Sequence, residues 1–227
     1  MPSGSDAAAN VLPSIGAVIF DCDGTLVDSE SAGLDVLHDH AVELGLDLSR
    51  ERVHEEFRGR RMTDSIATIG ALLPHRPADF EVDFERRVRA AMARRFRADL
   101  QAMPGALALL EALRVPFCVA TNGPRDKAEL TLGLTGLLKH MEGRIYSAYD
   151  VGSWKPAPGL FLHAAHALGI EPARCAVVED SLPGVEAGLA AGMQVYSMCQ
   201  HGMLPAPLAA RVTAITGLEE FDRLLHR

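Results

Sequence analysis

The sequence predicts an α/β protein with a doubly wound, mostly parallel sheet and an all-helical domain inserted after the first strand. Two observations carry this prediction. From residue 104 onward, short apolar runs alternate with stretches of helical periodicity, the order expected of parallel strands joined by crossover helices. Between residues 28 and 100, the apolar positions recur at helical spacing without a convincing strand pattern.

The chain therefore divides into three predicted parts. Residues 15–27 and 101–227 form the α/β core, and residues 28–100 form the inserted helical domain. The first residues, 1–14, lack the basic start and long apolar stretch of a signal peptide or membrane anchor, so we expect a disordered tail. With 227 residues, 48% of them apolar, the chain is long enough to bury a full core.

The first strand is predicted at residues 17–20 (AVIF), an apolar run that fits burial on both faces of a sheet. Asp21 and Asp23 follow at once, and in extended backbone their side chains project to the same side. Two neighbouring carboxylates repel each other unless a cation lies between them or one holds a proton. Open α/β sheets bind ligands at the carboxyl ends of their strands, so this pair marks a candidate site.

The remaining elements follow from periodicity and from Gly and Pro breaks. The inserted domain begins with Asp28 or Ser29 as the helix N-cap. Its helices are predicted at residues 28–44, 51–57, 62–73 and 79–100. In the core, helices are predicted at 106–113, after 124, at 159–168, after 181 and from 218, and strands at 116–120, 175–178, 193–198 and 212–215.

Composition limits the function classes. The formal net charge of -8 argues against binding nucleic acid by bulk electrostatics. Residues 50–97 contain 12 arginines against 8 acidic residues, which suits either an anionic small substrate or a solvated helix face. No stretch of 18 apolar residues predicts a membrane span, and the four cysteines are far apart, which predicts reduced thiols in the cytoplasm.

Polar residues follow three of the predicted core strands, and they converge if those strands are parallel neighbours. Asp21 follows the first strand, Thr121-Asn122 follows the strand at 116–120, and Glu179-Asp180 follows the strand at 175–178. Lys155 lies on a loop stiffened by Pro156 and Pro158. Each group alone fits a turn, a helix cap or a surface lysine, but their combination predicts one site.

The DxDGT sequence after the first strand, with the three later groups in order, resembles the four motifs of the haloacid dehalogenase-like superfamily. The similarity covers nearly the whole chain after the tail. It is strongest to members with a helical cap after the first motif, the subgroup of β-phosphoglucomutase and bacterial sugar-phosphate phosphatases. A helical cap is therefore the role expected for residues 28–100.

The resemblance implies a role for each residue. Asp21 is expected to be the nucleophile that attacks phosphorus, and Asp23 the acid and base that serves the leaving group and then water. Thr121, the Asn122 amide and Lys155 are expected to bind the phosphoryl oxygens. Because a free aspartate has a pKa of about 4, the surroundings of Asp23 are expected to raise its pKa.

The resemblance also implies Mg²⁺, because a carboxylate attacks a phosphate only when a cation offsets their repulsion. Asp21, the backbone carbonyl of Asp23, Asp180 and Glu179 are the expected ligands, with direct or water-mediated contact left open for Glu179. In the cap, arginines flank Gly59 where related proteins carry a specificity loop. We expect at least one of Arg58, Arg60 and Arg61 to contact the substrate, and name Arg58 as the candidate.

Three functions compete at this point: a Mg²⁺-dependent phosphatase of a small sugar or sugar-acid phosphate, a phosphosugar mutase, and a non-catalytic binder. Mutases of the subgroup resemble one another in a cap His and a cap Arg, where this sequence has Gly33 and Met62. A binder leaves the complete set of phosphoryl-transfer groups unexplained. The phosphatase is the leading hypothesis, acting as a monomer on a small phosphorylated metabolite.

Overall fold

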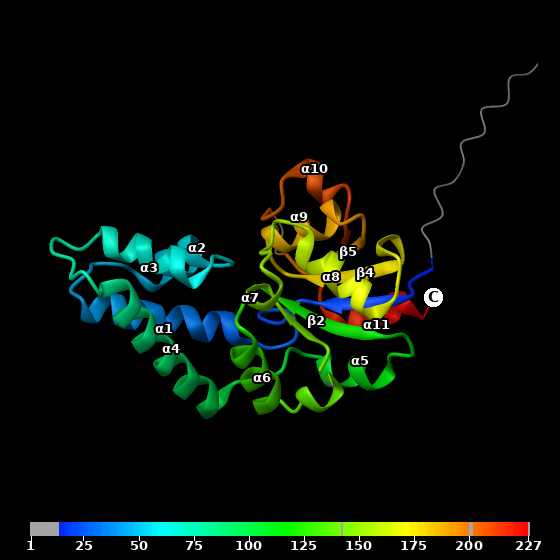
Figure 1. The fold of residues 1–227 in the computed structure, drawn as a ribbon, viewed down its shortest axis with the longest axis horizontal. Coiled ribbons are helices and arrows are strands. Elements are labelled where there is room, and N and C mark those ends of the chain that lie inside the picture. Colours follow the sequence, from blue (N-terminus) through cyan, green and yellow to red (C-terminus); the bar gives the residue numbers. More distant parts are fainter. Residues whose placement is uncertain (1–13, 142, 200–201, 227) are drawn as a thin grey trace, which may run out of the picture.

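The computed structural model of the chain describes residues 14–141, 143–199 and 202–226. Figure 1 shows an α/β body that contains the sheet and a helical lobe that extends from one end of it. The body holds the strands β1 (Ala17–Phe20), β2 (Phe117–Thr121), β3 (Ile145–Ser147), β4 (Cys175–Glu179), β5 (Gln194–Ser197) and β6 (Thr213–Ala214). The predicted tail at 1–14 lies outside the described residues except for Ser14.

The strands form one parallel sheet in the order β3-β2-β1-β4-β5-β6. β1 lies between β2 and β4, with Phe20 in register with Val119 and Val178. These are the three strands whose ends carry the predicted site groups. The doubly wound α/β fold is therefore confirmed.

Helices cover both faces of the sheet. The helices of the body are α5 (Ala106–Ala112), α6 (Arg125–Leu134), α7 (Ala148–Val151), α8 (Gly159–Leu168), α9 (Leu182–Ala190), α10 (Ala206–Ala209) and α11 (Leu218–Leu225), with the 3-10 turns η1 (Leu138–His140) and η2 (Pro172–Arg174). Val18 and Phe20 pack into the apolar layer under α5, α6 and α11. Ala17 and Ile19 pack into the opposite layer under α8 and α9, so β1 is buried on both faces as predicted.

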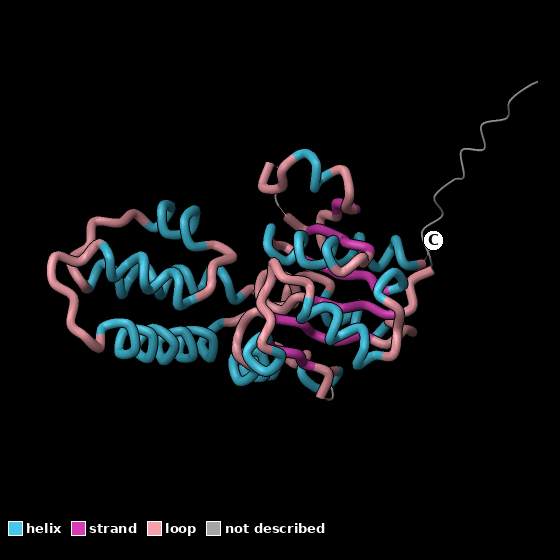
Figure 2. Tube along the Cα trace, turned by 45° about the horizontal axis from the view of Figure 1, so that its top comes forward, coloured by secondary structure: helices cyan, strands magenta, loops and turns pink. Residues whose placement is uncertain are grey.

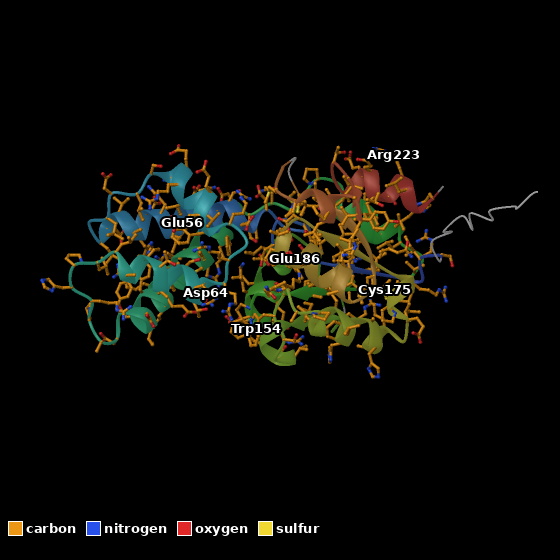
Figure 3. All side chains as sticks on the ribbon, turned by 90° about the horizontal axis from the view of Figure 1, so that it is seen from above. Glu56, Asp64, Trp154, Cys175, Glu186 and Arg223 are labelled. Carbon is orange, nitrogen blue, oxygen red and sulfur yellow. The ribbon has the colours of Figure 1, made fainter. Side chains whose placement is uncertain are left out.

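The helical lobe consists of α1 (Ser29–Glu43), α2 (Arg50–Phe57), α3 (Met62–Ala71) and α4 (Phe80–Asp99). These helices close around an apolar core of their own, which includes Leu37, Phe57, Ile69, Phe84 and Phe96. Figure 2 shows the lobe as helices and loops, with the strands confined to the body. Seen from above, Glu56 and Asp64 lie on the lobe, whereas Cys175 and Glu186 lie on the body (Figure 3).

Two chain segments connect the lobe to the body, and they lie side by side. The Asp28 N–H donates to the Gln101 carbonyl at 3.0 Å, and the Met103 N–H donates to the Leu26 carbonyl at 2.8 Å. Val27 and Ala102 form an antiparallel bridge between the segments. These hydrogen bonds tie the entry and exit of the helical lobe together beside Asp23.

Most predicted elements are present, with ends shifted by a few residues. The short helices α7 and α10 were not predicted, because four residues are too few to show a helical period. Asp28 occupies the N-cap position of α1, but its side chain makes no capping hydrogen bond. Within the described part of the chain, no helix is both long and apolar enough to cross a membrane.

Candidate active site

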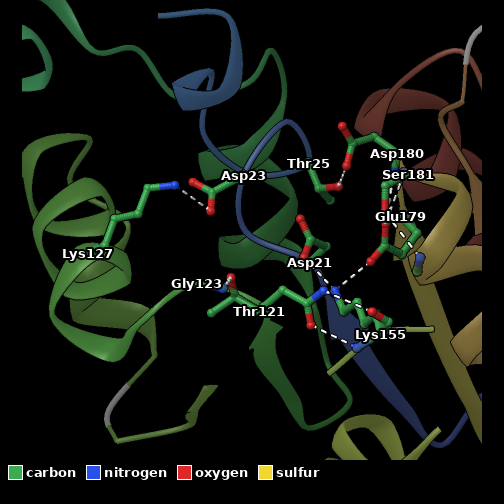
Figure 4. A network of polar contacts seen from close by, with 12 residues as sticks. Asp21, Asp23, Thr25, Thr121, Gly123, Lys127, Lys155, Glu179, Asp180 and Ser181 are labelled. Atoms are coloured by element: carbon green, nitrogen blue, oxygen red, sulfur yellow. Dashed lines mark hydrogen bonds and ion pairs between the residues drawn. The ribbon is translucent and has the colours of Figure 1, made fainter. Parts of the chain in front are cut away.

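The carboxyl ends of β2, β1 and β4 meet at one edge of the sheet and form the floor of a pocket under the helical lobe. The pocket is lined from the body by Asp21, Asp23, Thr121, Asn122, Lys127, Lys155 and Asp180, and from the lobe by Gly33, Phe57, Arg60, Arg61, Met62 and Arg89, among others. Figure 4 shows the polar network on this floor. The predicted convergence of the strand ends is confirmed, because the three strands are parallel neighbours.

Lys155 connects two carboxylates at the floor of the pocket. Its Nζ lies 2.5 Å from Asp21 Oδ1 and 2.5 Å from Glu179 Oε1, and its side chain is almost fully buried. An ammonium group shared by two buried acids is a charge-assisted arrangement that holds all three side chains in place. Lys155 is thus fixed beside the predicted nucleophile.

Glu179 is fully buried, and both of its oxygens accept hydrogen bonds. Oε1 accepts from Lys155, while Oε2 accepts from the N–H groups of Asp180 and Ser181, each at 3.1 Å, and from Ser181 Oγ at 2.9 Å. Gly184 makes room for this carboxylate, because a Cβ at that position would lie 1.9 Å from it. Glu179 therefore holds Lys155 and the start of α9 together.

Asp21, Glu179 and Asp180 each place a carboxylate oxygen within 4.8 Å of the other two. Burial raises the pKa of Asp21 to about 7, with Glu179 and Asp23 adding to the rise and Lys155 opposing it. Burial is also the main cause that raises the pKa of Asp180, and repulsion from the Asp21 and Glu179 carboxylates raises it further. A group of hard oxygen donors with this excess of negative charge fits Mg²⁺.

Asp180 reaches the site across a close backbone contact. Thr25 Oγ1 donates to Asp180 Oδ1 at 3.1 Å. A Cβ on Gly24 would lie 2.1 Å from Asp180 Oδ2, and Gly24 also has a positive φ of 85°. Gly24 therefore allows the turn and leaves room for the Asp180 carboxylate, and Thr25 holds that carboxylate by a hydrogen bond.

Asp23 faces the pocket and is held from two sides. Ser29 Oγ donates to its Oδ1. Lys127 Nζ lies 2.9 Å from its Oδ2 (Figure 4). Burial favours a higher pKa for Asp23, but Lys127 and Ser29 outweigh burial, so its pKa lies below the ordinary value. The expectation that the surroundings of Asp23 raise its pKa is therefore wrong for this structure.

Asn122 positions the loop that carries Lys155. Its Oδ1 accepts from the Lys155 N–H at 2.9 Å, and its Nδ2 donates to the Lys155 carbonyl at 3.3 Å. Thr121 Oγ1 accepts from the Gly123 N–H at 3.0 Å, which turns the chain at the end of β2. Thr121 and Asn122 both line the pocket, as the prediction that they bind phosphoryl oxygens requires.

Arginines enter the pocket from the lobe, but Arg58 is not among its lining residues. Arg58 Nη1 donates to Glu30 Oε2 at 2.7 Å, so an internal partner occupies its guanidinium. Arg60 and Arg61 do line the pocket, and Arg60 lies over the Phe57 ring, 5.7 Å from its centroid. Arg61 is paired as well, because its Nε donates to Asp64 Oδ2 at 2.8 Å. Which of the three arginines contacts the substrate therefore stays a prediction.

Sequence reasoning missed several residues of the site, among them Ser29, Arg89 and Lys127. Lys127 lies in the first turn of α6, soon after β2 ends at Thr121. Residues that closely follow the carboxyl end of a parallel strand lie near the ligand site, so this position could have been predicted. Ser29 lies four residues after Thr25, at a position for which the sequence predicts only a helix cap. Arg89 lies in the middle of α4, and nothing in the sequence separates it from the other arginines there.

Comparison with known proteins places this site in a family. Residues 15–192 match the family model for haloacid dehalogenase-like hydrolases. The chain is 36% identical over 210 residues to 6-phosphogluconate phosphatase of Escherichia coli, covering 92% of this chain and 94% of that protein. It is 32% identical over 211 residues to hexitol phosphatase A of Escherichia coli, covering 92% and 89%.

A solved structure agrees with these matches. A haloacid dehalogenase family hydrolase of Deinococcus radiodurans, solved with bound phosphate and sodium, superposes with a TM-score of 0.72 at 34% identity. The superposition covers 91% of this chain and 93% of that one. The chain therefore belongs to the haloacid dehalogenase-like hydrolase family, as a phosphoric monoester hydrolase.

Proposed function

We propose that the chain is a Mg²⁺-dependent phosphomonoesterase that hydrolyses a small sugar phosphate or sugar-acid phosphate through an aspartyl-phosphate on Asp21. One observation carries the proposal: Asp21 ends a buried strand beside Lys155, Glu179 and Asp180, while Asp23 faces the same pocket. Nucleophile, charge-neutralising groups and acid–base group are thus within one site.

The chemistry divides into two displacements. In the first, Asp21 Oδ attacks phosphorus while the bond from phosphorus to the ester oxygen breaks. Asp23, on which the negative charge of the bound phosphate favours a proton, gives that proton to the departing oxygen. In the second, Asp23 takes a proton from water, the water oxygen attacks phosphorus, and the bond to Asp21 breaks. Asp23 ends with the proton that it gave away, so the cycle returns to its start.

Negative charge on the transferring phosphoryl group needs fixed donors. Lys155 is the buried cation beside Asp21, and Thr121 and Asn122 line the pocket next to it. Donors held in place before the reaction stabilise developing charge without reorganising. The proposal assigns phosphoryl binding to these three residues, with Asn122 also fixing the Lys155 loop through its side chain.

Asp21, Asp180, the backbone carbonyl of Asp23 and Glu179 would hold Mg²⁺. The fit rests on the three clustered carboxylates and on the raised pKa of Asp21 and Asp180. When bound, the cation would offset the repulsion between the Asp21 carboxylate and the substrate phosphate. Glu179 already accepts hydrogen bonds at both oxygens, so water-mediated contact to the cation suits it best.

The substrate class is proposed from the relatives and from the charge of the lobe. The two Escherichia coli relatives are phosphatases named for 6-phosphogluconate and for hexitol phosphates. Arg60, Arg61 and Arg89 line the pocket from the lobe. Arg61 pairs with Asp64 and Arg89 with Glu85, whereas Arg60 has no acidic partner among the described residues. Arginine at that place suits a substrate with an anionic group besides the phosphate, as in a sugar acid.

The mutase alternative is weaker at this site. Gly33 and Met62 line the pocket at the positions where mutases of the subgroup resemble one another in a His and an Arg. The proposal keeps the predicted monomer, because the lobe and the body of the chain together line the pocket. The four free cysteines are consistent with the proposed cytoplasmic location.

Phosphate release with Mg²⁺ across sugar phosphates, sugar-acid phosphates, nucleotides and glycolytic intermediates tests the function. The panel includes 6-phosphogluconate and β-glucose 1-phosphate. We expect release from sugar-acid or sugar phosphates and little from nucleotides. Conversion of β-glucose 1-phosphate to the 6-phosphate without phosphate release would assign a mutase, and no reaction with any compound would remove the proposed function.

A further inference from the structure

Lys127 contacts the proposed acid–base residue from the body side of the pocket. Its Nζ lies 2.9 Å from Asp23 Oδ2, and its side chain is 27% exposed, so solvent reaches this pair only partly. Ser29 Oγ donates to the other oxygen, Oδ1. Both oxygens of Asp23 are therefore held, one by the start of the helical lobe and one by α6.

The surroundings of Lys127 fix where its ammonium lies. A Cβ on Gly123 would be in ordinary contact with both side chains, 3.5 Å from Asp23 Oδ2 and 3.7 Å from Lys127 Cδ, so Gly123 lies beside the place where they meet. The Phe96 ring, from α4 of the lobe, has its centroid 6.0 Å from Lys127 Nζ. Lys127 thus lies between the body and the lobe.

The two lysines of the site serve different acids. Lys155 pairs with Asp21 and Glu179, whereas Lys127 pairs with Asp23. The proposed mechanism assigns a role to Lys155 but none to Lys127. The long side chain of Lys127 nevertheless ends at the carboxylate of Asp23 rather than in solvent, so its function needs an explanation.

We propose that Lys127 is a positioning residue for the acid–base step: it holds the Asp23 carboxyl group by Oδ2 in the orientation that meets the leaving oxygen. The inference rests on the proposed function. A carboxyl group turns freely about two bonds, and two anchors restrict it to one orientation. Each oxygen keeps a lone pair besides the one its anchor uses, so Asp23 can still carry the proton. A misplacement of about 1 Å can reduce a rate about a hundredfold.

If Lys127 positions Asp23, the effect of removing Lys127 should depend on the leaving group of the substrate, which is not expected for a purely structural lysine. An alkoxide leaving group needs a proton as it departs, whereas p-nitrophenolate leaves without one. Losing the orientation of Asp23 should therefore slow the first displacement for a sugar phosphate and spare it for p-nitrophenyl phosphate. A lysine that only stabilised the fold, or only contacted the phosphoryl group, would affect both esters alike.

The test uses Lys127→Met, which removes the charge but keeps an apolar stem beside Phe96. Lys139→Met is the matched control, because Lys139 is exposed on η1. Rapid-quench kinetics with Mg²⁺ measure the p-nitrophenol burst and the single-turnover cleavage of the best sugar phosphate of the panel. We expect a burst rate within about threefold of the unsubstituted chain and sugar phosphate cleavage slower by about ten- to a hundredfold.

Two further variants tie the effect to Asp23. In an Asp23→Ala background, Lys127→Met should slow sugar phosphate cleavage no further, because the group that it positions is absent. Lys127→Arg, which can still donate to Oδ2, should recover part of the lost rate. Circular dichroism and thermal unfolding report whether each variant is folded.

The outcomes separate the inference from the proposed function. Equal slowing of both esters, or effects of Lys127→Met and Asp23→Ala that multiply, would overturn the positioning role. A raised KM with an unchanged single-turnover rate would instead make Lys127 a substrate contact and overturn it as well. If the unsubstituted chain cleaves no phosphate ester, the proposed function fails, and the inference falls with it.

Discussion

The Lys155 ammonium lies 2.5 Å from Asp21 Oδ1, although the two residues are 134 positions apart in the chain. This contact puts the charge of the proposed nucleophile next to a buried cation that also pairs with Glu179. The position of the Asp21 carboxylate at the end of β1 therefore depends on the loop that carries Lys155. Substitutions of single residues in this network test what each one contributes.

Asp21→Asn should abolish turnover while the fold is kept. The amide has the shape of the carboxylate but lacks its nucleophilic oxygen, so phosphate release should fall at least about a thousandfold. Phosphate release and circular dichroism check the two halves of the prediction. Substantial remaining activity in a folded variant would show that another group attacks phosphorus.

Asp23→Ala should separate substrates by their leaving groups. General acid–base catalysis typically contributes about a hundredfold or more, and p-nitrophenolate needs no acid. We expect a p-nitrophenol burst followed by slow turnover, with sugar phosphate cleavage nearly stopped. If single-turnover cleavage of both esters falls by the same factor, Asp23 is not the acid.

Lys155→Met should destabilise the chain as well as inactivate it. Removing one partner of a buried ion pair leaves the others uncompensated and costs about 3–5 kcal/mol. Urea unfolding should show this loss, and adding Glu179→Gln to Lys155→Met should restore part of it. Lys139→Met, on the surface, should stay within about 0.5 kcal/mol of the unsubstituted chain. No loss in Lys155→Met would mean that the observed pairing contributes nothing to stability.

Asp21 should make the metal-free chain less stable as pH rises. Its pKa is about 7 in the folded state, against an ordinary value of 3.8, so between those values the folded state binds more protons than the unfolded state. The stability of the unsubstituted chain relative to Asp21→Asn should therefore fall from about pH 4 to about pH 7 in a chelator. At high pH, Mg²⁺ should reverse this loss of stability, because it should raise the Tm of the unsubstituted chain more than that of Asp21→Asn. A relative stability that is flat or rises with pH would contradict the pKa direction.

Arg60→Met should raise KM for a sugar-acid phosphate more than for a neutral sugar phosphate. Arg60 lines the pocket, and within the described residues it has a ring contact with Phe57 but no acidic partner. Arg58→Met, which breaks the contact to Glu30, gives the comparison, and exposed Arg94→Met is the charge control. A larger effect from Arg58→Met would return the role to Arg58.

The floor of the site was predictable from sequence because parallel strands bring their carboxyl ends together. Asp21, Thr121 and Asp180 each follow an apolar run, and no side-chain detail is needed to place them. The orientation of the lobe arginines was not predictable. Gly59 has a positive φ of 72°, a backbone conformation that the sequence alone does not reveal, so the sequence could not show which neighbouring arginine lines the pocket.

Lys127 shows another limit of sequence reasoning. Its residue type and its place after Pro124 are those of many surface lysines in a first helical turn. Only the approach of α6 to the Asp23 turn, beside Gly123, makes it part of the site. The lowered pKa of Asp23 follows from that approach and was missed for the same reason.

The most direct test of the account is to find the phosphoryl group on the protein. The unsubstituted chain is mixed with its best sugar phosphate and Mg²⁺, quenched within one turnover, digested and analysed by mass spectrometry. We expect one phosphoryl group on the peptide that carries Asp21, and none in Asp21→Asn. Phosphate release without a labelled protein, or a label on a different residue, would contradict the account.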